Sequence, residues 1–123
     1  MAVFNPYQQY QQNSITSAKP GQLTLMLYNG AIKFIKTAIL GMEKKDIGTA
    51  NGAVIRAQEI IRYLDHTLDP QYEISQNLSS LYDYIYRRLV EANINKNAAV
   101  LEEVVSMVEE LRDTWMSVLK KTS

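Results

Sequence analysis

The distribution of apolar residues predicts four amphipathic helices. In the second and fourth of them, apolar positions recur in alternating steps of three and four, the heptad pattern of a helix that packs along one seam. In the second helix these positions are Ile47, Ala50, Val54, Ala57, Ile61, Leu64 and Leu68. In the fourth they are Leu101, Val104, Val108, Leu111, Trp115 and Val118. In the third, we expect inward-facing side chains at Ile74, Leu78, Leu81, Ile85, Leu89 and Ala92, with Tyr82, Tyr86 and Arg87 off that seam.

The first helix differs because it carries two apolar stripes side by side. One stripe consists of Leu23, Leu27, Ala31, Phe34 and Ala38. The other consists of Leu25, Tyr28, Ile32, Ile35, Ile39 and Met42. One stripe is enough to face a core. Two stripes indicate a helix that is buried on more than one side, or a helix with apolar surface to spare.

Capping and stop signals set the boundaries of these helices. Pro20 suits a first helical turn, Ser17 before it could cap that turn, and Asp46 and Asn97 are N-cap candidates. Asp69-Pro70 ends the second helix, because proline disfavours helical geometry in the residue before it. We therefore expect helices at about 19–42, 46–68, 73–93 and 97–120.

Short connections make neighbouring helices antiparallel. The predicted fold is all-α: an up-down-up-down four-helix bundle over residues 17–123, preceded by a short N-terminal cap or lid at residues 1–16.

Composition narrows the classes of function. The 13 basic and 13 acidic residues leave no basic face of the strength that nucleic-acid binding requires. With no cysteine, there is no disulfide framework and no thiolate metal site. No apolar run approaches the ~18 residues of a membrane span, and the N-terminus lacks the pattern of a secretory signal. We expect a cytoplasmic protein that does not insert into a membrane.

Residues suited to catalysis are scarce. His66 is the single histidine, so the paired Glu-x-x-His motifs of a di-metal bundle cannot form. The acidic pairs at 102–103 and 109–110 are expected on the solvated face of the fourth helix, where nothing would shift a pKa. No phosphate-binding loop is present. We predict no enzyme activity, no metal and no cofactor; the alternative is a phosphorelay bundle that carries acid-labile phosphate on His66.

The aromatic residues are mostly of one kind, with eight tyrosines beside two phenylalanines and one tryptophan. Tyrosine combines an apolar ring with a polar tip and suits interfaces that are wet part of the time. The segment "LYDYIYRR" at 81–88 places Tyr82 and Tyr86 one turn apart. These rings either fill gaps between helices or line a binding surface.

Four segments together resemble one protein family. They are "NPYQQYQQNSI" at 5–15, "PGQLTLMLYNGAIKFI" at 20–35, "LYDYIYRRLVEAN" at 81–93 and "LRDTW" at 111–115. In this order and spacing they resemble the flagellar secretion chaperone FliS family, over nearly the whole chain. The resemblance implies an antiparallel helical bundle with a short helical N-terminal cap and without enzyme activity.

The resemblance also implies the partners. The family binds the disordered C-terminal segment of flagellin, prevents its premature polymerisation and delivers it to the membrane export gate of the flagellar type III secretion system. We expect a monomer, with a weak dimer as the alternative. A constitutive, self-assembling structural protein is the competing interpretation of the surplus apolar surface.

Candidate client-binding residues lie in three segments. The N-terminal ones, which would form a lid over an apolar groove unless the segment is a disordered tail, are Tyr7, Tyr10 and Ile15. The others are Leu25, Tyr28, Asn29 and Ile32 on the first helix, and Tyr82, Tyr86 and Arg87 on the third. Rings and aliphatic chains would bury client side chains, and Asn29 and Arg87 would bond its polar groups. The alternative is that these residues belong to the bundle core.

Overall fold

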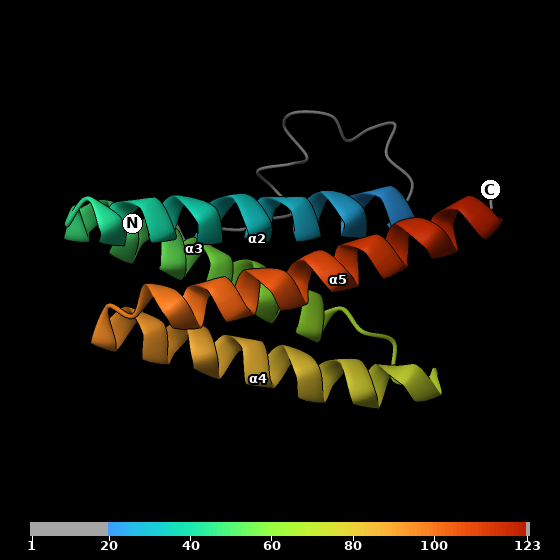
Figure 1. Cartoon of the computed structure of the whole chain (residues 1–123). Helices are drawn as coiled ribbons and strands as arrows, with labels where there is room; N and C mark the ends of the chain where they lie inside the picture. Colours follow the sequence, from blue (N-terminus) through green and yellow to red (C-terminus); the bar gives the residue numbers. More distant parts are fainter. Residues whose placement is uncertain (1–19, 123) are drawn as a thin grey trace, which may run out of the picture.

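A computed structural model describes residues 20–122 of the chain as four α-helices joined by short turns. They are α2 (Pro20–Glu43), α3 (Ile47–His66), α4 (Glu73–Asn95) and α5 (Ala98–Thr122). Consecutive helices run antiparallel, and α2 and α4 each pack against both α3 and α5 (Figure 1). The predicted all-α up-down-up-down bundle is confirmed. The predicted lid at 1–16 and the Ser17 cap lie outside the described residues.

Two helix starts are capped by the side chains that the sequence indicated. Asp46 accepts hydrogen bonds from the backbone N–H of Thr49 at 3.2 Å and from its hydroxyl at 2.7 Å, and both bonds lower the pKa of Asp46. The Asn97 side chain accepts from the backbone N–H of Ala99 at 3.0 Å. These bonds satisfy amide donors that a helix N-terminus leaves without partners. The capped turns are therefore tight enough to hold neighbouring helices antiparallel.

The connection between α3 and α4 differs slightly from the expectation. α3 ends at His66, two residues earlier than predicted, and the Thr67 hydroxyl donates to the carbonyl of Tyr63 at 3.0 Å. Asp69 then closes a turn by accepting from the backbone N–H of Gln71 at 2.9 Å. A side chain that bonds nearby backbone competes with the helical hydrogen bonds, so Thr67 ends the helix before the proline is reached.

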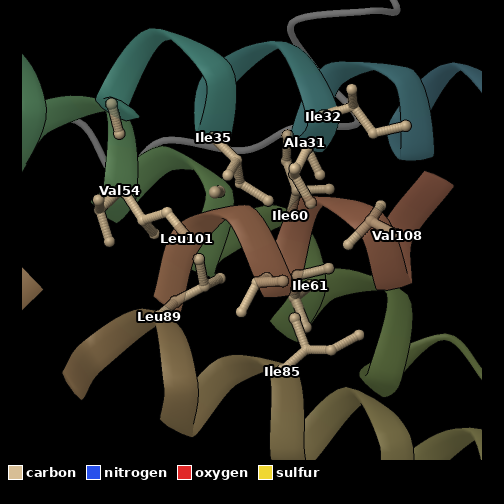
Figure 2. Packing of buried hydrophobic residues seen from close by; sticks show 14 of the residues in the cluster. Ala31, Ile32, Ile35, Val54, Ile60, Ile61, Ile85, Leu89, Leu101 and Val108 are labelled. Atoms are coloured by element: carbon tan, nitrogen blue, oxygen red, sulfur yellow. The ribbon is translucent and has the colours of Figure 1, made fainter. Parts of the chain in front are cut away.

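The hydrophobic core runs along the bundle axis and draws on all four helices (Figure 2). Its largest fully buried side chains are Leu27, Ile35, Val54, Ile60, Ile61, Ile85, Leu89, Leu101, Val104 and Val108. Both apolar stripes of α2 contribute, because this helix packs against α3 on one side and α5 on the other. The interpretation of α2 as a helix buried on more than one side is therefore correct.

The inward face of α4 is rotated slightly from the predicted one. Tyr82, expected off the seam, is 2% exposed, and Ser75 is buried, whereas Ile74 is 62% exposed and Leu81 is only partly buried. The true seam steps three, four, three, four, three through Ser75, Leu78, Tyr82, Ile85, Leu89 and Ala92. The sequence interpretation missed it because this seam places a serine and a tyrosine in the core. Both have polar partners: the Ser75 hydroxyl donates to the carbonyl of Asp69 at 2.6 Å, and Tyr82 bonds another tyrosine.

Two further positions in the heptad patterns are exposed. Ile47 in the first turn of α3 is 61% exposed, and Val118 near the end of α5 is 40% exposed. Both lie near a helix end. The heptad seams of α3 and α5 are therefore not buried at these ends.

By length and composition, α2 is the one described helix that could cross a membrane, over Gly21–Glu43. The expectation that no apolar stretch approaches such a span is corrected to this extent. However, 44% of that window is buried inside the bundle, between α3 and α5. A core helix of a soluble bundle passes the same test, and the packing accounts for its apolar composition.

Packing around the bundle is uneven. The α2–α3 interface is the most extensive and the α4–α5 interface is the sparsest. In Figure 1, the start of α4 and the end of α5 diverge, whereas the end of α4 and the start of α5 lie close together. One end of the bundle is therefore less tightly closed than the other.

Candidate functional site

Two of the candidate tyrosines meet inside the bundle. Tyr28 of α2 and Tyr82 of α4 are 4% and 2% exposed, and their hydroxyl oxygens lie 2.5 Å apart. α2 and α4 are diagonal helices with little other direct contact. This hydrogen bond therefore links two helices that the rest of the packing keeps apart.

Burial raises the pKa of the Tyr28 and Tyr82 hydroxyls above the usual range of tyrosine. For Tyr82, the neighbouring Tyr28 and the charge of Asp65 raise the pKa further. An ionised phenol would lie in a medium that solvates charge poorly, so both groups stay neutral near pH 7. The pair can act as a hydrogen-bonding element but not as a base.

The other candidates on α2 are spread around the helix. Ile32 is 5% exposed and belongs to the core, Leu25 is half-buried, and Asn29 is exposed. Tyr28, Ile32 and Tyr82 form part of the bundle core, and of the three only Tyr82 also borders a hollow that the structure describes. Tyr7, Tyr10 and Ile15 lie outside the described residues.

The remaining candidates on α4 lie on the outer side of the α3–α4 pair. Tyr86 is half-buried, and the guanidinium carbon of Arg62 lies 4.2 Å from the centre of its ring, within cation–π range. Tyr82 and Tyr86 both line a small hollow of about 100 Å³ together with Arg62, Asp65 and His66 of α3. Arg87 is exposed and pairs with Asp83 of its own helix at 3.0 Å.

Apolar side chains are incompletely covered where α4 and α5 diverge. Four inward-predicted residues, Leu78 and Leu81 of α4 with Leu111 and Trp115 of α5, are only half-buried. We call these four the open end of the bundle. Trp115 is held in place because its indole N–H donates to the carbonyl of Gly21 at 2.8 Å. The sequence pattern marked these residues as core and gave no sign that their cover is incomplete.

A polar cluster joins α4 to α5 away from the open end. Arg88 reaches Glu103 of α5 at 2.6 Å and Glu91 of its own helix at 2.9 Å. Tyr84 donates to the same Glu103 at 2.9 Å. These hydrogen bonds, from Arg88 first and Tyr84 second, lower the pKa of Glu103. The sparsest interface of the bundle is thus bridged by charge-assisted bonds.

The described residues give little support to catalysis. His66 is exposed on the last turn of α3. Between residues 20 and 122, no three acidic, histidine or cysteine side chains come together in a way that could hold a metal ion. Glu102 and Glu110 are exposed on α5, as the sequence indicated. Glu103 instead bonds Arg88 and Tyr84 of α4, and Glu109 pairs with Lys36 of α2 at 3.2 Å. The lowered pKa of Glu103 corrects the expectation that nothing would shift a pKa on this face.

Sequence comparison assigns the family. A family model described as "Flagellar protein FliS" matches residues 3–122. The chain belongs to the FliS family. It is 47% identical to the flagellar secretion chaperone FliS of Bacillus subtilis strain 168 over 120 residues, which cover 98% of this chain and 90% of that one. It is 36% identical to the flagellar secretion chaperone FliS of Salmonella typhimurium strain LT2, over 91% of this chain and 85% of the relative.

A solved structure supports the architecture separately. A protein described as a flagellar chaperone from bacteria aligns with a TM-score of 0.79, covering 94% of this chain and 95% of its own, at 19% identity. At this identity the likeness concerns the fold alone. Membership of a family of secretion chaperones supports a role in flagellar protein export and is consistent with a non-enzymatic protein.

Proposed function

We propose that this chain is a cytoplasmic export chaperone that binds the disordered C-terminal segment of flagellin. It prevents that segment from polymerising early and helps to deliver it to the membrane export gate of the flagellar type III secretion system. The observation that carries the proposal is a set of apolar side chains that stay half-buried at one end of the bundle, in a member of a family of flagellar secretion chaperones.

The physical argument starts from the client. A segment that later packs helix against helix has an apolar side, and free in the cytoplasm it would bind copies of itself. A bundle with uncovered leucine and aromatic side chains can host such a segment as an amphipathic helix or an extended strand. Because the client is ordered only on binding, part of the interaction free energy is spent on that ordering. Binding of the client is therefore reversible, as export requires.

Within the proposed binding surface, the accessible candidates contribute first. Leu25, Asn29, Tyr86 and Arg87 are half-buried or exposed and can meet a client without any change in the bundle. Tyr7, Tyr10 and Ile15 would act as a lid that moves when the client arrives. The open end adds apolar area where α4 and α5 diverge. Tyr28, Ile32 and Tyr82 are buried in the core and would contact a client only if the bundle opened.

The test is a calorimetric titration of the chain with a peptide that covers the C-terminal segment of flagellin from the same organism. We expect one-to-one binding with a negative heat-capacity change, and circular dichroism should show a gain in helix. A folded chain that does not bind this peptide contradicts the proposal. Stable oligomers of such a non-binding chain would favour the self-assembling alternative.

A matched pair of tyrosines tests the surface. Tyr86→Ala should weaken client binding and leave the melting temperature within a few degrees of the wild type. Tyr84, two residues away on another face of α4, bonds Glu103 of α5. Tyr84→Ala should leave client binding unchanged. Equal effects of the two variants on binding would place the client elsewhere.

A further inference from the structure

The α3–α4 connection borders an open hollow with a volume of about 500 Å³. This volume lies within the range of small-ligand sites. Its apolar wall consists of Leu68, Pro70 and Tyr72, and its polar wall contains Ser75, Gln76 and Ser79. The two charged residues that line it are Asp65 and Glu73.

The charge of this hollow is uncompensated. Both charged lining residues are acidic, and no lysine or arginine lines it. Within residues 20–122, neither Asp65 nor Glu73 forms an ion pair. Arg62 of α3 lines the smaller neighbouring hollow, where it lies over the ring of Tyr86. A cationic group entering the hollow would therefore meet two carboxylates with no competing cation in the lining.

Two exposed apolar side chains belong to this part of the chain: Tyr72, which lines the hollow, and Ile74, two residues further along. Tyr72 and Ile74 are 65% and 62% exposed, the largest such fractions at this end of the bundle. They can cover the aliphatic part of a long basic side chain, or the apolar residues next to it, while the charged head reaches the carboxylates.

The hollow also adjoins the proposed client surface. Asp65 lines both this hollow and the smaller one that contains Tyr82 and Tyr86. No side chain among the first 18 residues is charged, so that segment offers no lysine or arginine side chain to the hollow. The partner that fits is therefore a segment of another protein that lies along α4.

We propose that the hollow between Asp65 and Glu73 binds a lysine or arginine side chain of the bound client, next to client apolar residues that cover Tyr72 and Ile74. This inference rests on the proposed function. The rest of the proposed client surface recognises apolar side chains, and this hollow adds one ionic contact that we call the charge anchor. A contact at one defined position fixes the register in which the client lies on the bundle.

The test uses the flagellin C-terminal peptide and a chain with Asp65→Asn and Glu73→Gln. We expect about 5- to 20-fold weaker binding at low salt, since each partly exposed ion pair contributes up to about a fivefold change in affinity. The wild type should lose affinity as salt rises, and the variant should lose much less. Glu102→Gln with Glu110→Gln removes two exposed charges from α5 and serves as the matched control, with affinity unchanged.

Peptide variants locate the contact. Lysines and arginines of the peptide are replaced by glutamine one at a time, and one replacement should weaken binding to the wild type but not to the double variant. A photo-crosslinking residue at position 76, which lines the hollow, should attach next to that same position.

The outcomes are distinguishable. If the wild type binds and the double variant binds equally well with the same salt dependence, the charge anchor is wrong and the proposed function stands. If the folded wild type does not bind the peptide, both the proposed function and the anchor are wrong.

Discussion

The hydroxyl groups of Tyr28 and Tyr82 bond each other across the diagonal of the bundle, 2.5 Å apart and almost fully buried. The two hydroxyls are satisfied chiefly by each other, because nearly every other side chain around them in the core is apolar. Removing one leaves the other buried without its partner, and an unsatisfied buried polar group is more costly than the absence of both.

Tyr28→Phe and Tyr82→Phe should therefore each lower the free energy of unfolding by about 1–2 kcal/mol. The double variant should be destabilised by less than the sum, because it leaves no orphaned hydroxyl. Urea denaturation of the four proteins measures the coupling. Strictly additive losses would mean that the bond contributes nothing of its own.

The same pair predicts the behaviour at high pH. The folded-state pKa of both tyrosines is raised above that of the unfolded chain, near 10. Their contribution to stability is therefore complete below pH 10 and is lost as the pH rises beyond it. Absorbance of tyrosinate should show that this pair ionises late and together with the loss of helix, whereas the exposed Tyr84, whose pKa is raised by its bond to Glu103, can ionise without it. In the double phenylalanine variant this late phase should vanish, and a persisting phase would assign it to other tyrosines.

Replacing each of two glycines in the α2–α3 pair by alanine should change the stability of the bundle in opposite directions. A Cβ added at Gly41 would lie 3.0 Å from the backbone nitrogen of Ala50, so the two helices would have to separate. Gly41→Ala should destabilise the bundle by about 1–3 kcal/mol, in the range of overpacked cores. At Gly52 nothing lies within 4 Å of the added atom, and Gly52→Ala should stabilise by about 0.5–1 kcal/mol. Thermal denaturation of both variants checks this, and a stabilised Gly41→Ala would disprove the close approach.

The ion pair between Arg88 of α4 and Glu103 of α5 predicts that the stability of the bundle decreases in acid. Arg88 holds the pKa of Glu103 below its usual range, so this contribution to stability is present above the unfolded pKa of glutamate and is lost as the pH falls. Arg88→Gln should lower the melting temperature at pH 7 and make little difference near pH 3. Arg87→Gln is the control, because Arg87 pairs only within α4 at an exposed position. A melting-temperature difference that persists near pH 3 would point to lost packing of the arginine stem instead.

Sequence patterns predicted much of this fold but not the site. Heptad steps and capping residues placed four helices and their order, because both are local properties. They failed at Ser75 and Tyr82, whose burial depends on polar partners at the carbonyl of Asp69 and at Tyr28. One of these partners lies 54 residues away in the chain. A polar residue on a regular seam is the signal that could have revealed the pair.

The open end was invisible for a related reason. Leu78 and Leu111 fit their seams as well as any core leucine, yet both are only half-buried. Burial depends on how far neighbouring helices diverge, and periodicity within one helix carries no information about that distance. The candidates Asn29 and Arg87 are exposed, and their role in client binding stays a prediction. For Tyr28 and Ile32 the structure favours the alternative of a place in the core.

Between residues 73 and 81, the first half of α4, the only buried side chain is that of Ser75. A helical stretch with so little apolar anchorage opens locally at a small fraction of the global unfolding free energy. Its amide hydrogens would exchange with solvent long before those of the doubly packed α2. These two helical turns can thus open while α2, α3 and the rest of α4 keep their places, so that part of the bundle unfolds without the fold being lost.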